Sequence, residues 1–273
     1  MPYRVLAFDS GIGGLGIVHN LQTQLKTTDL QVSIDYLADN LVFPYGEQED
    51  NFLVERIINL IGQAIQSIKP NLVIIACNTA STIALDRLRK IYPFIPFVGC
   101  VPPVRWAARV SQSKIIGLLA TRATIARPYL CHLKEQFASD CKLIAYGSPV
   151  LAKLAENYFR TKSCDIHLIQ QELDNMFNHP YSDQMDAICI GCTHYSFILD
   201  LLRQNTSPSI QWLDPAAAVA KHTIDILRQE KFSHTDNNVN NCFYSTAPLT
   251  KDKPLLSRLA LMKFTQIKTF ILQ

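Results

Sequence analysis

One stretch decides the fold: Leu72-Val73-Ile74-Ile75-Ala76-Cys77-Asn78-Thr79-Ala80-Ser81-Thr82. A short run of apolar, mostly β-branched residues leads into Cys77, and polar residues then open a helix. A run this short, bounded by polar residues, is typical of a strand buried on both faces of a parallel sheet. The pattern returns at Ala187-Ile188-Cys189-Ile190-Gly191-Cys192-Thr193-His194-Tyr195-Ser196, which predicts two similar halves.

The two cysteines at the ends of these predicted strands are candidates for chemistry. Each one lies at the carboxyl edge of a sheet, where open α/β sheets bind ligands. Each also precedes a helix N-terminus, whose partial positive charge favours thiolate over thiol. Two such thiols, one from each half, could face a single cleft from opposite sides, an arrangement suited to reversible proton transfer at a carbon.

Composition narrows the class of protein. The chain has 273 residues, of which 48% are hydrophobic and 18% charged, with a net charge of +3. This favours a globular chain of two domains and offers no apolar run of membrane-spanning length. The basic residues are scattered, so we expect no nucleic-acid partner and no membrane partner. The N-terminus leads directly into a strand without a signal peptide, which predicts a cytoplasmic protein.

Strands and helices alternate along the whole chain, which predicts an α/β fold with mainly parallel sheets. We expect two pseudo-symmetric domains, each a sheet flanked by helices, with the active site in the cleft between them. Prolines around residues 93–103 mark the crossover between the domains. The first predicted domain is discontinuous and comprises residues 1–98 and 208–273, and the second comprises 99–207. The predicted strands cover residues 4–8, 33–38, 72–76, 97–99, 114–120, 142–146, 187–191 and 210–213, with two further segments near 242–244 and 264–267.

The eight cysteines are interpreted as free thiols, because a chain of this size and expected location does not depend on disulfides. Cys189 and Cys192 form the only CxxC pair. Strand alternation places these two side chains on opposite faces, and no second ligand pair is spaced for a structural zinc site. No metal site is therefore predicted.

Three other functions each account for part of the sequence. The turn Gly11-x-Gly13-x-x-Gly16 satisfies a dinucleotide fingerprint, but Asp9 and Ser10 precede it, and a carboxylate there would repel a pyrophosphate; a tight turn explains the glycines at least as well. A cysteine hydrolase built from one thiol with His194 leaves the second thiol unexplained. A non-catalytic amino-acid sensor does not need both cysteines.

The motifs resemble those of the bacterial glutamate racemases, within the aspartate/glutamate racemase superfamily. The resemblance rests on four ordered motifs that span residues 9 to 195, with weaker similarity through Leu213-Asp214. His194, where the wider family usually has Glu after Cys-Thr, points to the glutamate branch. The four motifs are Asp9-Ser10-Gly11-Ile12-Gly13-Gly14, Asp39 with Pro44-Tyr45-Gly46, Ala76-Cys77-Asn78-Thr79-Ala80-Ser81, and Gly191-Cys192-Thr193-His194-Tyr195.

The resemblance implies an isomerase that interconverts L- and D-glutamate by two-cysteine proton transfer without a cofactor. It assigns Cys77 to the D-glutamate face and Cys192 to the L-glutamate face. Asp9 would assist Cys77, while His194, with Glu156, would assist Cys192. The implied substrate-binding residues are Asp9, Ser10, Tyr45, Gly46, Asn78, Thr79, Thr121, Thr193 and His194.

The resemblance also implies a biological role and partners. D-glutamate would be supplied for peptidoglycan, and hence for cell-wall biogenesis and cell shape. Members of the family are often dimers, so a homodimer is possible. Some members carry an N-terminal extension linked to activation by a cell-wall precursor, whereas this sequence begins at its first predicted strand, which argues against such activation here.

Overall fold

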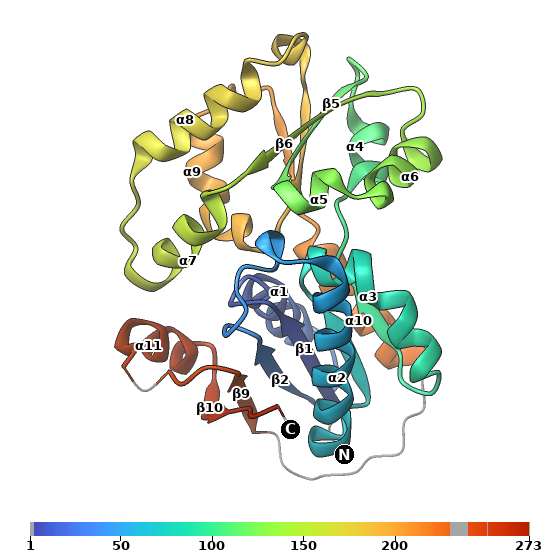
Figure 1. The fold of residues 1–273 in the computed structure, drawn as a ribbon, viewed down its shortest axis with the longest axis vertical. Coiled ribbons are helices and arrows are strands. Elements are labelled where there is room, and N and C mark those ends of the chain that lie inside the picture. Colours follow the sequence, from blue (N-terminus) through green and yellow to red (C-terminus); the bar gives the residue numbers. More distant parts are fainter. Residues whose placement is uncertain (1–2, 230–239, 250, 273) are drawn as a thin grey trace. The chain divides into compact units, whose positions relative to one another are not determined.

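The computed structural model describes residues 3–229, 240–249 and 251–272. The chain divides into two compact units (Figure 1), each described by itself. Unit 1 comprises Met1–Cys100 and Ala216–Gln273, and unit 2 comprises Val101–Pro215. Within the described ranges, no helix combines the length and apolar character that a membrane crossing requires.

Unit 1 contains a six-stranded sheet in which every recorded strand pair is parallel. Its order is β10-β9-β2-β1-β3-β4. The central strand β1 is buried over its last five residues, and β3 is buried throughout, as expected for strands covered on both faces. The strands are β1 (Tyr3–Asp9), β2 (Val32–Ala38), β3 (Leu72–Ile75), β4 (Phe97–Gly99), β9 (Asn241–Ser245) and β10 (Phe264–Thr269).

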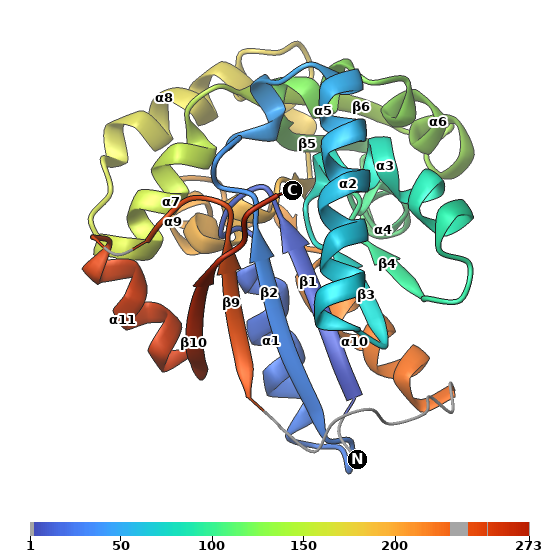
Figure 2. The same cartoon turned by 60° about the horizontal axis from the view of Figure 1, so that its bottom comes forward.

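Helices cover both faces of this sheet, with α2 in front of the strands and α1 behind them in the view of Figure 2. The apolar stripe of α2, which includes Leu53, Ile57, Leu60 and Ile61, packs on Leu6, Phe8, Val73 and Ile75 of the sheet. The helices of unit 1 are α1 (Leu15–Leu25), α2 (Asp50–Ile68), α3 (Asn78–Ile91), α10 (Ala216–Gln229) and α11 (Lys253–Leu261), with a short 3-10 helix η1 (Tyr45–Glu47).

Unit 2 contains a smaller parallel sheet with the order β6-β5-β7-β8. The strands are β5 (Ile115–Thr121), β6 (Lys142–Ser148), β7 (Ala187–Gly191) and β8 (Gln211–Leu213). The helices are α4 (Val104–Val110), α5 (Arg122–Ala126), α6 (Pro128–Phe137), α7 (Leu151–Thr161), α8 (Ile166–Phe177) and α9 (Leu199–Gln204), with the 3-10 helices η2 (Ser182–Gln184) and η3 (Thr193–Ile198).

The fold class predicted from the sequence is confirmed, and β9 and β10 complete the first sheet as expected. The predicted return to the first domain at residue 208 is wrong, because β8 pairs with β7 in the second sheet and the chain returns only at Ala216. The predicted crossover near residue 98 lies two residues from the observed boundary at Cys100. A strand as short as β8 carries no signal in the sequence for which of two parallel sheets it joins.

Replacement of Ile57 by alanine tests the packing of α2 on the sheet. Ile57 is fully buried, so its truncation is expected to lower the free energy of unfolding by about 2–5 kcal/mol. Phe52→Ala on the same helix is the control, because Phe52 is 49% exposed and its loss should change stability by only about 0.5 kcal/mol. Urea denaturation, monitored by circular dichroism, gives the free energy of unfolding of both variants. Equal losses of stability in the two would contradict the described packing.

Candidate functional site

Cys77 lies where β3 gives way to α3. Its backbone is extended (φ −69°, ψ 125°), and Asn78 begins the helix. The side chain is 6% exposed, and its Sγ lies 3.8 Å from the Ser10 Oγ, which accepts a hydrogen bond from the thiol. The location at a strand end and a helix start is the one predicted from the sequence.

Asp9 lies beside Cys77 because of strand register. Phe8 of β1 is paired with Ile75 of β3, so the residues that follow both strands emerge side by side. The Ser10 Oγ donates to the Asp9 Oδ1 at 3.3 Å, and the carboxylate is fully buried. Thiol, hydroxyl and carboxylate therefore form a chain from Cys77 through Ser10 to Asp9.

The glycine turn after β1 is closed by this same carboxylate. The Gly11 N–H donates to the Asp9 Oδ1 at 2.9 Å. A Cβ added at Gly14 would lie 2.6 Å from the Cβ of Ala76, so glycine is needed there for close approach of the turn to β3. Both facts favour the tight-turn interpretation. The Gly14 position needs a glycine for packing, and the Gly11 N–H, which a pyrophosphate would need, is already bonded to Asp9.

Asn78 has a buried side-chain amide whose hydrogen-bonding groups are available to a ligand. Its side chain is 3% exposed, yet neither its amide nitrogen nor its amide oxygen has a hydrogen-bond partner among the described residues. A buried amide without partners costs free energy, so a polar ligand that bonded both atoms would remove this cost. Thr79, 4% exposed, follows it in the first turn of α3. We call Asp9, Ser10, Cys77, Asn78 and Thr79 the Cys77 cluster.

Tyr45 and Gly46 lie in η1, which Asp39 anchors. The Tyr45 hydroxyl donates to the Asp39 Oδ2 at 2.6 Å, and the Arg56 guanidinium donates to both oxygens of the same carboxylate at 2.6 Å. Burial, followed by the Asp39 charge, raises the pKa of Tyr45 well above its ordinary value. The Tyr45 hydroxyl is thus bonded within the protein. A ligand near η1 would therefore contact the backbone, including that of Gly46, and not the Tyr45 hydroxyl.

Arg56 was missed by sequence reasoning. It is the one basic residue of the amphipathic helix α2, and Asp39 at a strand end needed a cationic partner, but nothing in the sequence joins the two. The pairing forms because α2 passes beside the carboxyl end of β2.

Cys192 lies in the corresponding place in unit 2, between β7 and η3, and is 7% exposed. Its Sγ lies 3.8 Å from the Nδ1 of His194. The His194 Nε2 lies 3.1 Å from the Glu156 Oε1, and the Arg160 Nη1 donates to the Glu156 Oε2 at 2.7 Å. We call Cys192, His194, Glu156 and Arg160 the Cys192 chain.

The charge on Glu156 is stabilised by its partners. Burial alone would raise its pKa, but the hydrogen bond and charge of His194, together with Arg160, lower it to about 2. The carboxylate therefore remains ionised at neutral pH. Sequence reasoning named Glu156 only through the family resemblance and missed Arg160, although a spacing of four residues on a helix predicts such a pair.

Thr121 and Thr193 flank Cys192. Ala120 of β5 is paired with Gly191 of β7, so Thr121 emerges beside Cys192. The Thr121 Oγ1 caps α5 by accepting from the Thr124 N–H, and the two hydroxyls lie 2.9 Å apart. Thr193 is 6% exposed and begins η3.

Each unit thus gathers its own predicted residues at the carboxyl edge of its own sheet. Asp9, Ser10, Asn78 and Thr79 surround Cys77, while Thr121, Thr193, His194 and Glu156 belong with Cys192.

Cys189 differs from both reactive candidates. It is fully buried within β7, and this burial raises the pKa of its thiol. All eight cysteines are free, as predicted. Among the residues that the structure describes, no group of three or more His, Cys, Asp or Glu side chains could hold a metal ion.

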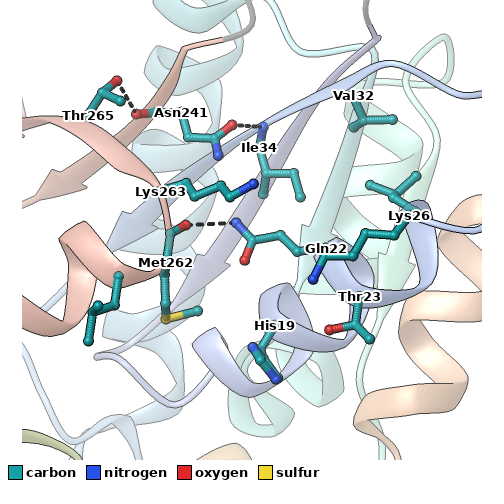
Figure 3. A pocket seen from close by; sticks show the side chains of 12 residues that line it. His19, Gln22, Thr23, Lys26, Val32, Ile34, Asn241, Met262, Lys263 and Thr265 are labelled. Carbon is teal, nitrogen blue, oxygen red and sulfur yellow. Dashed lines mark hydrogen bonds between the residues drawn. The ribbon is translucent and has the colours of Figure 1, made fainter.

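Unit 1 has a pocket (Figure 3) that no residue of the Cys77 cluster lines. Its lining comes from α1, the start of β2 and the turn between α11 and β10, and includes Lys26, Val32 and Lys263. Val32 begins β2, whereas the Cys77 cluster lies at the carboxyl ends of the strands. No predicted site residue lines this pocket.

Comparison with known proteins gives concordant results. The profile of the Asp/Glu/hydantoin racemase family matches residues 45–223. A glutamate racemase of Granulibacter bethesdensis is 44% identical over 223 residues, which are 82% of this chain and 78% of that protein. A glutamate racemase of Brucella anthropi is 37% identical over 227 residues, which are 83% and 80% of the two chains.

A solved structure agrees over the whole length. The crystal structure of Escherichia coli glutamate racemase, in complex with L-glutamate and the activator UDP-MurNAc-Ala, matches with a TM-score of 0.91 and 30% identity, covering 100% of both chains. The chain therefore belongs to the Asp/Glu/hydantoin racemase family and, within it, to the glutamate racemases, which are isomerases.

Proposed function

We propose that this racemase inverts the α-carbon of glutamate with the thiols of Cys77 and Cys192, one on each face. One observation carries the proposal: each unit ends its sheet in a buried thiol linked to a chain of polar groups. Cys77 is linked through Ser10 to Asp9, and Cys192 through His194 to Glu156.

Starting from L-glutamate, the Cys192 thiolate takes the α-proton. The C–H bond breaks, an S–H bond forms, and the electron pair stays on the α-carbon. The Cys77 thiol then gives its proton to the opposite face, which forms the new C–H bond and leaves Cys77 as thiolate. The reverse reaction exchanges the two roles, so the ionisation of the two thiols is coupled.

His194 supports the Cys192 half of this exchange. Because its Nε2 faces the Glu156 carboxylate, Nε2 carries a proton and Nδ1 is the nitrogen that faces the thiol. Nδ1 then accepts from the thiol or, when protonated, stabilises the thiolate. In the Cys77 half of the exchange, Asp9 acts through Ser10, and the negative charge of Asp9 makes the Cys77 thiolate a stronger base.

The proposed substrate contacts use polar groups near the two thiols, without the Tyr45 hydroxyl, which is bonded to Asp39. The buried amide of Asn78 has no hydrogen-bond partner within the described part of the chain, and it offers both a donor and an acceptor beside Cys77. The Escherichia coli relative binds L-glutamate, which supports glutamate as the substrate here. Ser10, Thr79, Thr121 and Thr193 add hydroxyls, and Gly46 adds backbone groups, for the ammonium and two carboxylates.

We further propose that the product D-glutamate is used for peptidoglycan, which would place the enzyme in the cytoplasm. The activator of the Escherichia coli relative, UDP-MurNAc-Ala, supports a connection of such racemases with the cell wall.

Proton NMR in deuterium oxide tests the two-thiol mechanism. Wild-type protein with L-glutamate is expected to lose the α-proton signal while D-glutamate appears. Cys77→Ser and Cys192→Ser should each lower the rate at which D-glutamate appears at least about a hundredfold, because an alcohol is a far weaker acid than a thiol. Cys131→Ser, at an exposed thiol, is the control. An unchanged α-proton with wild-type enzyme, or full activity in either cysteine variant, would contradict the mechanism.

Glu156→Gln tests the support that the Cys192 chain gives to its thiol. The amide keeps the size of the carboxylate but loses its charge, so we expect kcat/KM to fall on the order of tenfold to a hundredfold. Glu172→Gln is the matched control, because Glu172 is also buried in unit 2 but bonds Tyr146 instead. Steady-state kinetics measures kcat/KM for both variants. An equal fall in the two would argue against a role of Glu156 in supporting Cys192.

The same variant tests the ionisation of Glu156 through stability. Since folding lowers its pKa from 4.5 to about 2, the unfolded chain takes up the proton first as the pH falls. The stabilisation is therefore fully present above pH 4.5 and is lost between pH 4.5 and about 2. Thermal melts across this range should show wild type losing stability relative to Glu156→Gln; parallel curves would refute the shift.

A further inference from the structure

We infer that Arg160 is a positioning residue for the reaction at Cys192, because it holds the Glu156 carboxylate in the orientation that bonds His194. This inference deepens the proposed function and rests on it. The effect that we assign to Arg160 reaches the thiol through Glu156 and His194.

The two oxygens of Glu156 are divided between two partners. Oε1 faces the His194 Nε2 at 3.1 Å, and Oε2 accepts from the Arg160 Nη1 at 2.7 Å. A carboxylate fixed at both oxygens cannot rotate about its terminal torsion without losing one bond. Arg160 therefore determines which way the remaining oxygen points.

The ion pair lies in a sheltered place. The side chains of Glu156 and Arg160 are 10% and 23% exposed, and that of His194 is 3% exposed. Solvent and salt screen such a pair less than a surface pair. Arg203, by contrast, pairs with Asp200 on the surface of the same unit, with side chains 51% and 89% exposed.

Apolar packing holds α7 against η3 independently of this arginine. The rings of Phe159 and Phe197 lie 4.5 Å apart between centroids, and the Phe197 ring also meets His194 edge-on at 6.4 Å. Loss of Arg160 therefore leaves the helix in place. What it removes is the second anchor of the Glu156 carboxylate, and with it the fixed acceptor for the His194 Nε2 proton.

Isotope effects separate this role from a loss of folded protein. Racemisation moves two protons, and deuterium at the α-carbon slows only the first. With L-glutamate, Cys192 performs that first step; with D-glutamate, it performs the second. A defect confined to Cys192 therefore raises the deuterium isotope effect on kcat/KM for L-glutamate and lowers it for D-glutamate.

The experiment compares Arg160→Gln with wild type, Arg160→Lys and the surface control Arg203→Gln, using α-deuterated L- and D-glutamate. For Arg160→Gln we expect kcat/KM to fall on the order of tenfold in both directions. The deuterium isotope effect on kcat/KM should rise with L-glutamate and fall with D-glutamate. Arg160→Lys keeps the charge without the guanidinium geometry, so its divergence should be smaller, and Arg203→Gln should match wild type.

Isotope effects are independent of the fraction of active enzyme, so a destabilised variant still gives an interpretable result. Unchanged isotope effects with a lower rate would make Arg160 merely structural and overturn the inference. Should Arg160→Gln yield no folded protein, Arg160→Lys decides by the same criterion. If wild type itself fails to exchange the α-proton, the proposed function fails instead, which is a separate result.

Discussion

The register of parallel strands is the constraint on which the rest of this structure depends. Neighbouring parallel strands end at one edge, so residues far apart in sequence emerge together there. The pairing of Phe8 with Ile75 brings Asp9 and Ser10 to Cys77, and the pairing of Ala120 with Gly191 brings Thr121 to Cys192. A shift of one residue in either pairing would turn these side chains to the opposite face of the sheet.

The two thiols share a position in the fold but differ in their supporting groups. Cys77 is supported by a hydroxyl and a fully buried carboxylate, whereas Cys192 is supported by an imidazole whose carboxylate is itself paired with arginine. The first environment places negative charge near its thiol. The second provides a group that can hold a proton. The two sides of the proposed exchange are therefore chemically unequal, although the reaction that they perform is symmetric.

The sequence predicts those features that local pattern encodes. Cys77, Cys192 and their neighbours Asn78, Thr79 and His194 lie where a buried strand meets a helix, and that transition is visible in the residues themselves. The strand alternation likewise predicts two parallel sheets. The placement of β8 in the second sheet was not predictable, because Gln211–Leu213 is too short to identify its neighbour. Arg56 was missed because its pairing with Asp39 depends on how α2 passes the end of β2. Arg160 was missed because its role depends on Glu156, one helical turn away, being the carboxylate that bonds His194.

The discontinuity of unit 1 has a consequence for the order of folding during synthesis. Unit 2 is a single continuous stretch, Val101–Pro215, so all of it is synthesised before α10, β9 and β10. The strand β2 meanwhile lacks its neighbour β9, and Asp39 lacks its bond from Thr246. The domain translated second is thus the first that can complete its sheet, and the N-terminal strands must wait, with one edge uncovered, for the last part of the chain.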